Sequence, residues 1–237
     1  MQNWKRRLRH LFLISRRRYK LLIKRIHGPA HASISPAMEF LVNHFGKDSI
    51  NVLEIGARFG DSSEMIMKSL NVSRFYVVDP YDIYDDYKDD GFYKVLEDLG
   101  GDLVYKSAVK RLTQLNEGVT FLRCRSDDSK VFDTIPKESL DLVFIDGNHE
   151  YEYVYNDLIN YLPLVRSGGV LCGDDFQTRR IPKLSEPRSN AGNRRMVFEA
   201  VCDFASEKGL TFITFGEQLL NPKVYAFVIA QDSVGKS

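Results

Sequence analysis

The sequence predicts an α/β protein built around one mostly parallel β-sheet. From residue 50 onward, short apolar runs alternate with segments whose apolar residues recur at helical spacing, which is the pattern of repeated strand–helix units. The apolar runs are nearly continuous, as is typical of strands that are buried on both faces. The last two runs leave no room for a helix between them, so we expect one antiparallel strand near the end of the sheet.

The first half of the chain supplies three strands and the helices around them. Ser35 and Pro36 are the expected N-cap and first residue of a helix, because a proline in the first turn has no N–H to leave unpaired. The β-rich run that ends at Asp79-Pro80 is a strand, and a Tyr- and Asp-rich loop follows it. The elements expected here are strands over 50–55, 74–78 and 119–124, and helices over 35–45, 62–70 and 92–116.

The second half continues the alternation and then ends it. The run over 140–145 is apolar at nearly every position, as expected for a central strand. A helix then leads to a strand that ends at Gly173, and the closing pair of strands follows the last helix. The elements expected here are strands over 140–145, 169–173, 210–215 and 224–230, and helices over 151–165 and 194–208.

The net charge of +1 conceals an uneven distribution of charge along the chain. Residues 1–27 contain ten basic residues and no acidic one, so the remainder carries 23 basic and 32 acidic residues. An acidic body does not attract nucleic acid by general charge, and we expect no specific nucleic-acid partner. We therefore divide the chain into a basic amphipathic helix over residues 1–28 and a domain over residues 29–237.

The basic helix carries an apolar stripe, and three interpretations of it remain open. Trp4, Leu8, Leu11 and Leu22 lie along one side of a helix whose other sides are mostly basic. Such a helix suits an anionic membrane surface. It also suits a contact between subunits of a homo-oligomer through residues 1–27. Its Arg-rich, acid-free composition is shared with transit peptides.

Cysteine usage and hydropathy indicate a cytoplasmic protein, which the basic helix would make peripheral to a membrane in one of these interpretations. Cys124, Cys172 and Cys202 lie in or beside apolar runs and show no metal-ligand spacing, which indicates reduced core cysteines. No apolar run approaches the roughly 18 residues that span a bilayer.

Acidic residues stand at the end of every predicted parallel strand. Because the carboxyl ends of parallel strands meet at one edge of a sheet, where open α/β sheets bind ligands, these side chains are expected to converge. An edge of this kind suits hydroxyl groups, cations or a metal ion. The acids are Glu54, Asp79, Asp127, Asp128, Asp146, Asp174 and Asp175.

The glycine-rich loop after the first strand is not a dinucleotide fingerprint. Arg58 stands where the fingerprint needs its middle glycine, which disfavours an NAD-dependent enzyme. The acid two residues before Gly56 suits a cationic ligand better than a phosphate. Asp79, at the end of the second strand, is placed to accept the two ribose hydroxyls of a nucleoside.

These strand ends resemble those of class I S-adenosylmethionine-dependent methyltransferases. The resemblance covers about residues 35–230 and is similar in detail to the small metal-dependent O-methyltransferases of the macrocin O-methyltransferase type. It implies a Rossmann-like seven-stranded sheet of order 3-2-1-4-5-7-6, with strand 7 antiparallel. The segments that carry it are LEIGARFGDSS, VVDPY and LDLVFIDGNHEYEYVYNDLINYLPLVRSGGVLCGDDF.

The resemblance also implies roles for individual residues. Family members hold S-adenosylmethionine with the loop after the first strand, an acid after the second and a polar loop after the third. The corresponding residues here are Glu54, Gly56, Ala57, Gly60, Asp79, Ser126 and Asp127. The metal-dependent members bind a divalent cation at the positions of Asp146, Asp174 and Asp175, and His149 matches a position proposed as general base.

This donor set makes chemical sense for methylation of a hydroxyl. A neutral hydroxyl is a poor nucleophile, and a divalent cation held by carboxylates would lower its pKa and fix its approach. Oxygen ligands favour Mg²⁺, Mn²⁺ or Ca²⁺ over Zn²⁺, and three neighbouring carboxylates repel one another unless a cation lies between them. His149, with an ordinary pKa near 6.5, is suited to accept the proton.

Structural alternatives stay open for several of these residues. Asp146 would also suit an N-cap of the following helix, and the acid pair after the fifth strand would suit a solvated loop. His149 could be an ordinary hydrogen-bonding residue, and Asp79 a turn former before Pro80. The long loops after the second and fifth strands are either solvated connections or segments that bind substrate.

The sequence thus predicts a metal-dependent S-adenosylmethionine O-methyltransferase (EC 2.1.1.-). Its expected catalytic residues are Asp146 and His149, and its expected acceptor is a small hydroxylated molecule, a sugar or glycoconjugate. The alternative from another class is a non-catalytic protein of the same fold that anchors an assembly through its basic helix.

Overall fold

The computed structural model describes residues 32–83, 93–176, 196–216 and 223–230. The chain divides into two compact units, Met1–Ala32 and Ser33–Ser237. The basic helix predicted over residues 1–28 lies outside the described residues, as do most of the two long loops, so those hypotheses stay predictions. Among the described residues, no helix is both long and apolar enough to cross a membrane.

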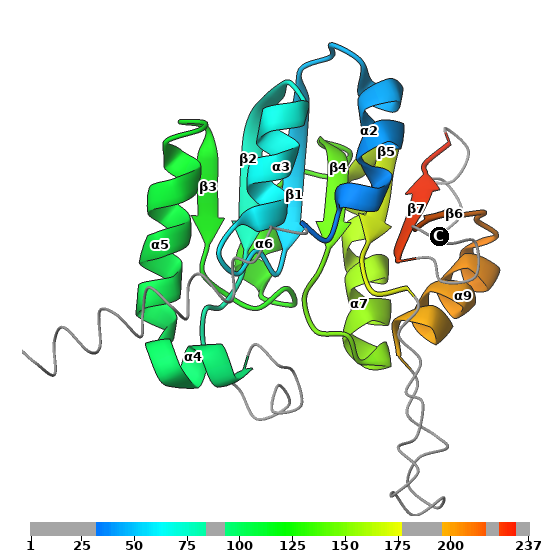
Figure 1. Ribbon diagram of the computed structural model, residues 1–237. Coiled ribbons are helices and arrows are strands. Elements are labelled where there is room, and N and C mark those ends of the chain that lie inside the picture. The colour runs from blue at the N-terminus through cyan, green and yellow to red at the C-terminus, as the bar shows by residue number, and fades with distance from the viewer. Residues whose placement is uncertain (1–31, 84–92, 177–195, 217–222, 231–237) are drawn as a thin grey trace, which may run out of the picture. The chain divides into compact units, whose positions relative to one another are not determined.

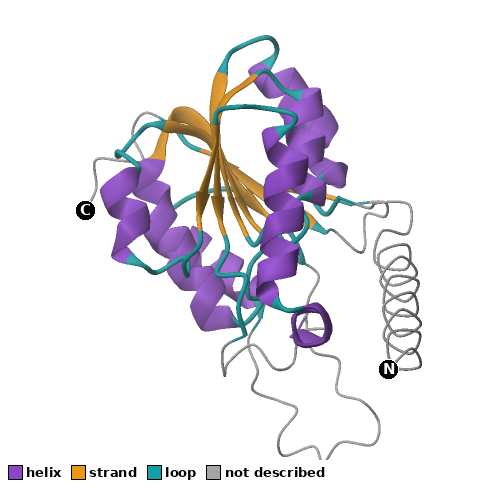
Figure 2. Ribbon diagram, turned by 90° about the vertical axis from the view of Figure 1, so that its left-hand side faces the viewer, coloured by secondary structure: helices purple, strands orange, loops and turns teal. Residues whose placement is uncertain are grey.

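The predicted fold class is confirmed. Seven strands form one sheet in the order β3-β2-β1-β4-β5-β7-β6, with helices on both of its faces (Figures 1 and 2). The first five strands are parallel, and β7 runs antiparallel to both β5 and β6. The strands are β1 (Ile50–Ile55), β2 (Val72–Val78), β3 (Val119–Leu122), β4 (Leu140–Ile145), β5 (Val165–Gly173), β6 (Ile213–Phe215) and β7 (Val224–Val228).

The register of the central strands brings their carboxyl ends level with one another. Ile55, the last residue of β1, pairs with Val78 of β2 on one side and with Ile145 of β4 on the other. The residues that follow the three strands therefore emerge side by side. The chain turns from β1 toward β2 and later returns to add β4 on the opposite side of β1, which makes this the topological switch point of the sheet.

Two helical layers cover the sheet. On one face α3 contacts both α2 and α5, and on the other α7 packs against α9. Figure 2 shows helices on both sides of the sheet. Alternate residues of the central strands point to opposite layers, so β1 places Leu53 and Ile55 in the core beneath α7. The helices are α2 (Met38–Phe45), α3 (Asp61–Ser69), α4 (Tyr93–Leu99), α5 (Gly101–Thr113), α6 (Ser129–Thr134), α7 (Tyr151–Tyr161) and α9 (Val197–Lys208).

The segment 92–116, expected to be mostly helical, contains two helices, α4 and α5. It is broken between α4 and α5 at Gly100, whose φ of 77° is outside the helical range. The next residue, Gly101, lies against the carbonyl of Tyr81, where an added Cβ would approach the oxygen to 1.6 Å. The break therefore lets the chain pass close to the loop after β2.

Other boundaries also differ from the sequence-based ones. The helix expected over 151–165 ends at Tyr161, where the 3-10 turn Leu162–Leu164 leads directly into β5. Ser35 does not cap a helix, because it is the first residue of a 3-10 turn over Ser35–Ala37 that precedes α2. The N-cap of this turn is Ile34. The short helix α6 was not expected from the sequence.

We predict that Gly56→Ala severely destabilises the fold, because a Cβ there would lie 2.1 Å from the backbone oxygen of Asp146. Backbone at the end of β4 cannot move aside as a side chain can, so we expect a loss of more than about 3 kcal/mol in the free energy of unfolding. Gly46→Ala is the matched control, since Gly46 also has positive φ but has open space around it. It should cost about 1 kcal/mol. Equal losses in urea unfolding of the two variants would contradict the steric argument.

Candidate active site

A cleft with about 610 Å³ of empty space lies at the carboxyl ends of the central strands. Four of the residues expected in a site line it: Gly56, Asp79, Ser126 and Asp146. Other residues that line the cleft include Arg58, Pro80, Leu96, Arg125, Asn148, Tyr153 and Asp157. The cleft therefore draws on the ends of β1, β2, β3 and β4, as the strand-end acids predicted.

Asp79 organises the glycine-rich loop on one side of the cleft. Its carboxylate accepts the backbone N–H of Arg58 at 2.9 Å and that of Tyr81 at 2.7 Å. Burial raises the pKa of Asp79, while these two hydrogen bonds oppose the rise. Arg58 occupies the left-handed region with φ of 52°, the conformation that a glycine would ordinarily supply. Each carboxylate oxygen keeps acceptor capacity for a further donor.

Glu54 lies behind the loop and not on the cleft wall. It is 1% exposed and accepts a hydrogen bond from the hydroxyl of Ser63 in the first turn of α3. Burial raises its pKa to about 8, although the bond from Ser63 opposes the rise. Ala57 and Gly60 are also behind the wall: Ala57 is buried, and Gly60 is the N-cap of α3 with φ of 82°.

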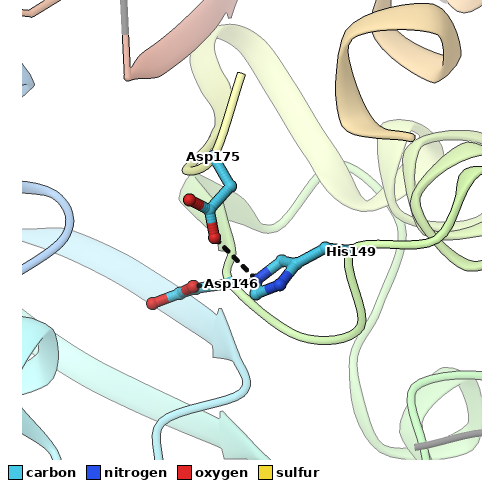
Figure 3. A group of neighbouring side chains, drawn as sticks. All are labelled: Asp146, His149 and Asp175. Carbon is cyan, nitrogen blue, oxygen red and sulfur yellow. Dashed lines mark ion pairs between the residues drawn. The ribbon is translucent and has the colours of Figure 1, made fainter. Parts of the chain in front are cut away.

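Asp146, His149 and Asp175 form an acid–histidine cluster beside the cleft. The Nε2 of His149 lies 3.0 Å from Oδ2 of Asp175 and 3.7 Å from Oδ1 of Asp146, and Figure 3 shows the three side chains converging. Burial of the imidazole disfavours its charged form, but the two carboxylates outweigh that effect and raise the pKa of His149 to about 10. The arrangement therefore stabilises a positive charge on His149.

Asp174 lies next to this cluster but outside its converging atoms. Its Oδ1 is buried and has no hydrogen-bond partner among the described residues. Burial raises the pKa of Asp174 to about 8, and the charges of Asp146 and Asp175 add to the rise. A buried carboxylate oxygen without a donor is unfavourable unless a cation or a donor reaches it.

The acid–histidine cluster and Asp174 fit a divalent cation. One ligand atom each from Asp146, His149 and Asp175 lie within 4.8 Å of one another. Two carboxylates and an imidazole suit Mn²⁺ and related ions, and they accept Mg²⁺ through the oxygens. The set of converging atoms differs from the expected trio of Asp146, Asp174 and Asp175 by including His149, while the unpaired oxygen of Asp174 is a fourth donor nearby.

Ser33 is a site residue that the sequence analysis missed. Its hydroxyl donates to Oδ2 of Asp146 at 2.6 Å and lies 2.9 Å from the hydroxyl of Ser62. A serine has one hydroxyl proton, so Ser33, which gives that proton to Asp146, must accept from Ser62. No motif marks Ser33, because only the folded chain brings it to a carboxylate 113 residues away.

The structure also separates Asp146 from the role of a helix cap. The N-cap of α7 is Glu150, and the Oδ1 of Asn148 accepts the backbone N–H of Glu150 at 2.9 Å. Asp146 instead follows β4 directly, and its own N–H donates to the carbonyl of Ile55 at the end of β1. Its carboxylate is therefore left to Ser33, to His149 and to the cleft.

Comparison with known proteins identifies one family. A family model described as a methyltransferase domain matches residues 53–176, which is more than half of the chain and runs from within β1 to the end of β5 and beyond. An uncharacterized protein of Acanthamoeba polyphaga mimivirus is 29% identical over 146 residues, which are 60% of this chain. The alignment spans about 59% of that relative's length.

Solved structures share the fold at low sequence identity. An O-methyltransferase of Bacillus cereus in complex with SAH has a TM-score of 0.54 and 19% identity, with 88% of each chain covered. An O-methyltransferase of Streptomyces achromogenes involved in tomaymycin synthesis, in complex with SAM, has a TM-score of 0.52 and 16% identity, covering 85% of this chain and 82% of its own. An rRNA methylase of Streptococcus thermophilus has a TM-score of 0.52 and 11% identity, with 84% and 97% covered.

We predict that Glu54→Gln changes how stability depends on pH. The pKa of Glu54 is raised from 4.5 to about 8 in the folded state, so the native protein loses stability as pH rises through that window. The loss approaches about 1.4 kcal/mol per pH unit within it, and a neutral glutamine removes it. Urea unfolding at pH 5, 6.5 and 8 measures the difference. The exposed Glu39→Gln is the control, and equal pH dependence in both variants would refute the assignment.

Proposed function

The chain belongs to the methyltransferase-domain family, and from this premise we propose that it transfers a methyl group from S-adenosylmethionine to a hydroxyl of a small acceptor. The observation that carries the proposal is that one residue, Asp146, belongs both to the cleft wall and to the acid–histidine cluster. It lines the cleft together with Gly56 and Asp79, and it contacts His149 in the acid–histidine cluster. A nucleoside site and a proton-accepting site are therefore continuous.

The cleft supports binding of the methyl donor through groups of matching charge. Asp79 holds the loop with two backbone hydrogen bonds and keeps acceptor capacity for ribose hydroxyls. Glu54 lies beneath the same loop, where its ionised form would stabilise a cationic ligand. S-adenosylmethionine, when bound, supplies a methyl group that is open to attack by a nucleophile in line with the sulfonium.

The acid–histidine cluster supports removal of the acceptor's proton. His149 accepts a proton from a hydroxyl only as the neutral imidazole, whereas Asp146 and Asp175 favour its protonated form. A cation bound beside these carboxylates would offset their charge, lower the pKa of His149 and so make the neutral form available. Ser33 holds Oδ2 of Asp146, which leaves Oδ1 of that carboxylate facing His149. A divalent cation, when held by Asp146, Asp175 and the neighbouring Asp174, would supply further acidification of the hydroxyl and leave Nε2 of His149 to accept the proton.

A sugar or glycoconjugate is the proposed acceptor class. Three carboxylates beside the cleft suit the hydroxyl groups of a polyol, which can donate to them. The excess of acid in the body opposes a polyanionic acceptor such as nucleic acid. A screen of sugar nucleotides, free glycosides and phenols for methyl transfer would identify the acceptor.

We predict that the protein binds S-adenosylhomocysteine and that Asp79→Asn weakens this binding at least tenfold. The amide cannot accept from both ribose hydroxyls while also holding Arg58 and Tyr81, and one such hydrogen bond to a charged group is worth about 1.5–3 kcal/mol. Isothermal titration calorimetry measures both affinities. Asp48→Asn, an exposed change in the turn before β1 and outside the cleft lining, is the control and should bind as the unmodified protein does.

Absence of binding to either cofactor form below about 1 mM would contradict the proposed activity. It would favour the alternative in which the chain is a non-catalytic member of the family that anchors an assembly.

We also predict that Mn²⁺ binds at the acid–histidine cluster and that Asp175→Asn lowers its affinity at least tenfold. Loss of one of two carboxylate ligands removes half of the negative charge that holds the ion. Electron paramagnetic resonance of free Mn²⁺ gives the affinity directly and needs no acceptor. Asp133→Asn, at an exposed residue of α6 outside the cleft lining, is the control. Full methyl transfer in excess EDTA would remove the metal from the proposal and leave His149 as base.

A further inference from the structure

Two acids stand near the loop after β3, and only one of them faces the cleft. The side chain of Asp127 is 57% exposed, and its two oxygens accept from Nε and the terminal nitrogen of Arg125 at 3.0 and 3.1 Å. Asp157, on α7, is 3% exposed and lines the cleft. Asp127, which the family resemblance assigns to cofactor binding, is thus paired with Arg125, and the buried acid at the cleft wall, Asp157, is one that no motif marks.

The surroundings of Asp157 hold it as part of the cleft wall. Its carboxylate accepts from the hydroxyl of Ser126, and the hydroxyl of Tyr161, one turn further along α7, donates to the carbonyl of Ser126 at 2.9 Å. The two bonds tie the loop after β3 to α7. Burial raises the pKa of Asp157 to about 7, and the bond from Ser126 opposes the rise. One serine donor leaves a carboxylate with capacity for a further N–H donor.

The same part of the chain offers a donor and apolar walls. The Nδ2 of Asn148 is buried and has no hydrogen-bond partner among the described residues, while its Oδ1 is held by the N–H of Glu150. Pro80, Leu96 and Tyr153 add apolar surface to the cleft lining. A flat heterocycle fits such walls, and an edge that carries both an amino group and a ring nitrogen fits a carboxylate acceptor beside an amide donor.

We propose that Asp157 is a specificity-determining residue that selects the nucleobase of the methyl donor by accepting a hydrogen bond from the exocyclic amino group of adenine. The assignment rests on the proposed function, since it takes S-adenosylmethionine as the ligand of the cleft. It places base selection on α7, with Asn148 as the complementary donor, and leaves Asp127 as a surface ion pair. A 6-oxo base presents the opposite pattern, because it offers an acceptor where adenine offers a donor.

The test compares base discrimination rather than affinity. Isothermal titration calorimetry of the full chain with S-adenosylhomocysteine and with S-inosylhomocysteine gives the ratio of the two dissociation constants. The unmodified protein should prefer the adenosyl compound at least 30-fold, because the oxo compound leaves a buried acceptor facing an acceptor. Asp157→Asn should reduce the ratio at least tenfold, since its amide can donate to the 6-oxo group. Asp127→Asn, the matched control, should keep the ratio of the unmodified protein.

A second measurement needs no variant and guards against a fold that fails in Asp157→Asn. The homocysteine analogue with hydrogen in place of the amino group is no larger than the adenosyl compound, and the unmodified protein should bind it about tenfold more weakly. Two results would overturn the assignment while the proposed function stands. One is equal binding of these two compounds. The other is a ratio of dissociation constants for the inosyl and adenosyl compounds that is the same in folded Asp157→Asn as in Asp127→Asn. If the unmodified protein binds none of the compounds, the proposed function fails and this assignment fails with it.

Discussion

The carboxyl edge of the sheet depends on how the fold accommodates carboxylates that are buried beside one another. Glu54, Asp146 and Asp174 end or follow three neighbouring strands, and for Glu54 and Asp174 burial and nearby carboxylates disfavour the charged form. Glu54 and Asp146 each accept a hydrogen bond from a serine hydroxyl. The positive charge of His149 lies between Asp146 and Asp175. The loops that surround the cleft are arranged around these donors.

The first turn of α3 supplies both hydroxyl donors to this edge. Ser63 donates a hydrogen bond directly to Glu54. Ser62 donates a hydrogen bond to Ser33, whose own hydroxyl donates one to Asp146. Consecutive residues on a helix point about 100° apart, so a single turn reaches β1 with one serine and the segment before α2 with the other. The glycine loop that starts this turn is held in place by Asp79 through Arg58, so the cleft wall and the carboxylate supports form one unit.

This unit explains why the cleft and the acid–histidine cluster lie side by side. The charge that makes the edge costly for an empty protein is the charge that a sulfonium, an ammonium group or a divalent cation would neutralise. Ligand binding and relief of electrostatic strain are then the same event. The overall net charge of +1 conceals an excess of acidic residues in the domain. These acidic residues are concentrated where such ligands would bind.

The sequence by itself determined the fold class, because apolar periodicity is local, and its family resemblance implied the strand order that the structure has. The strand ends indicated the edge of the sheet where the cleft lies, because parallel strands align their carboxyl ends. The sequence also singled out Gly56, Asp79, Ser126 and Asp146, which stand next to strand ends. Only the tertiary structure decided that His149 joins Asp146 and Asp175, that Asp127 turns to Arg125, and that Ser33 and Asp157 enter the site. The direction of a side chain after a strand depends on loop backbone and on partners distant in sequence. Those partners meet only when the helices have packed on the sheet.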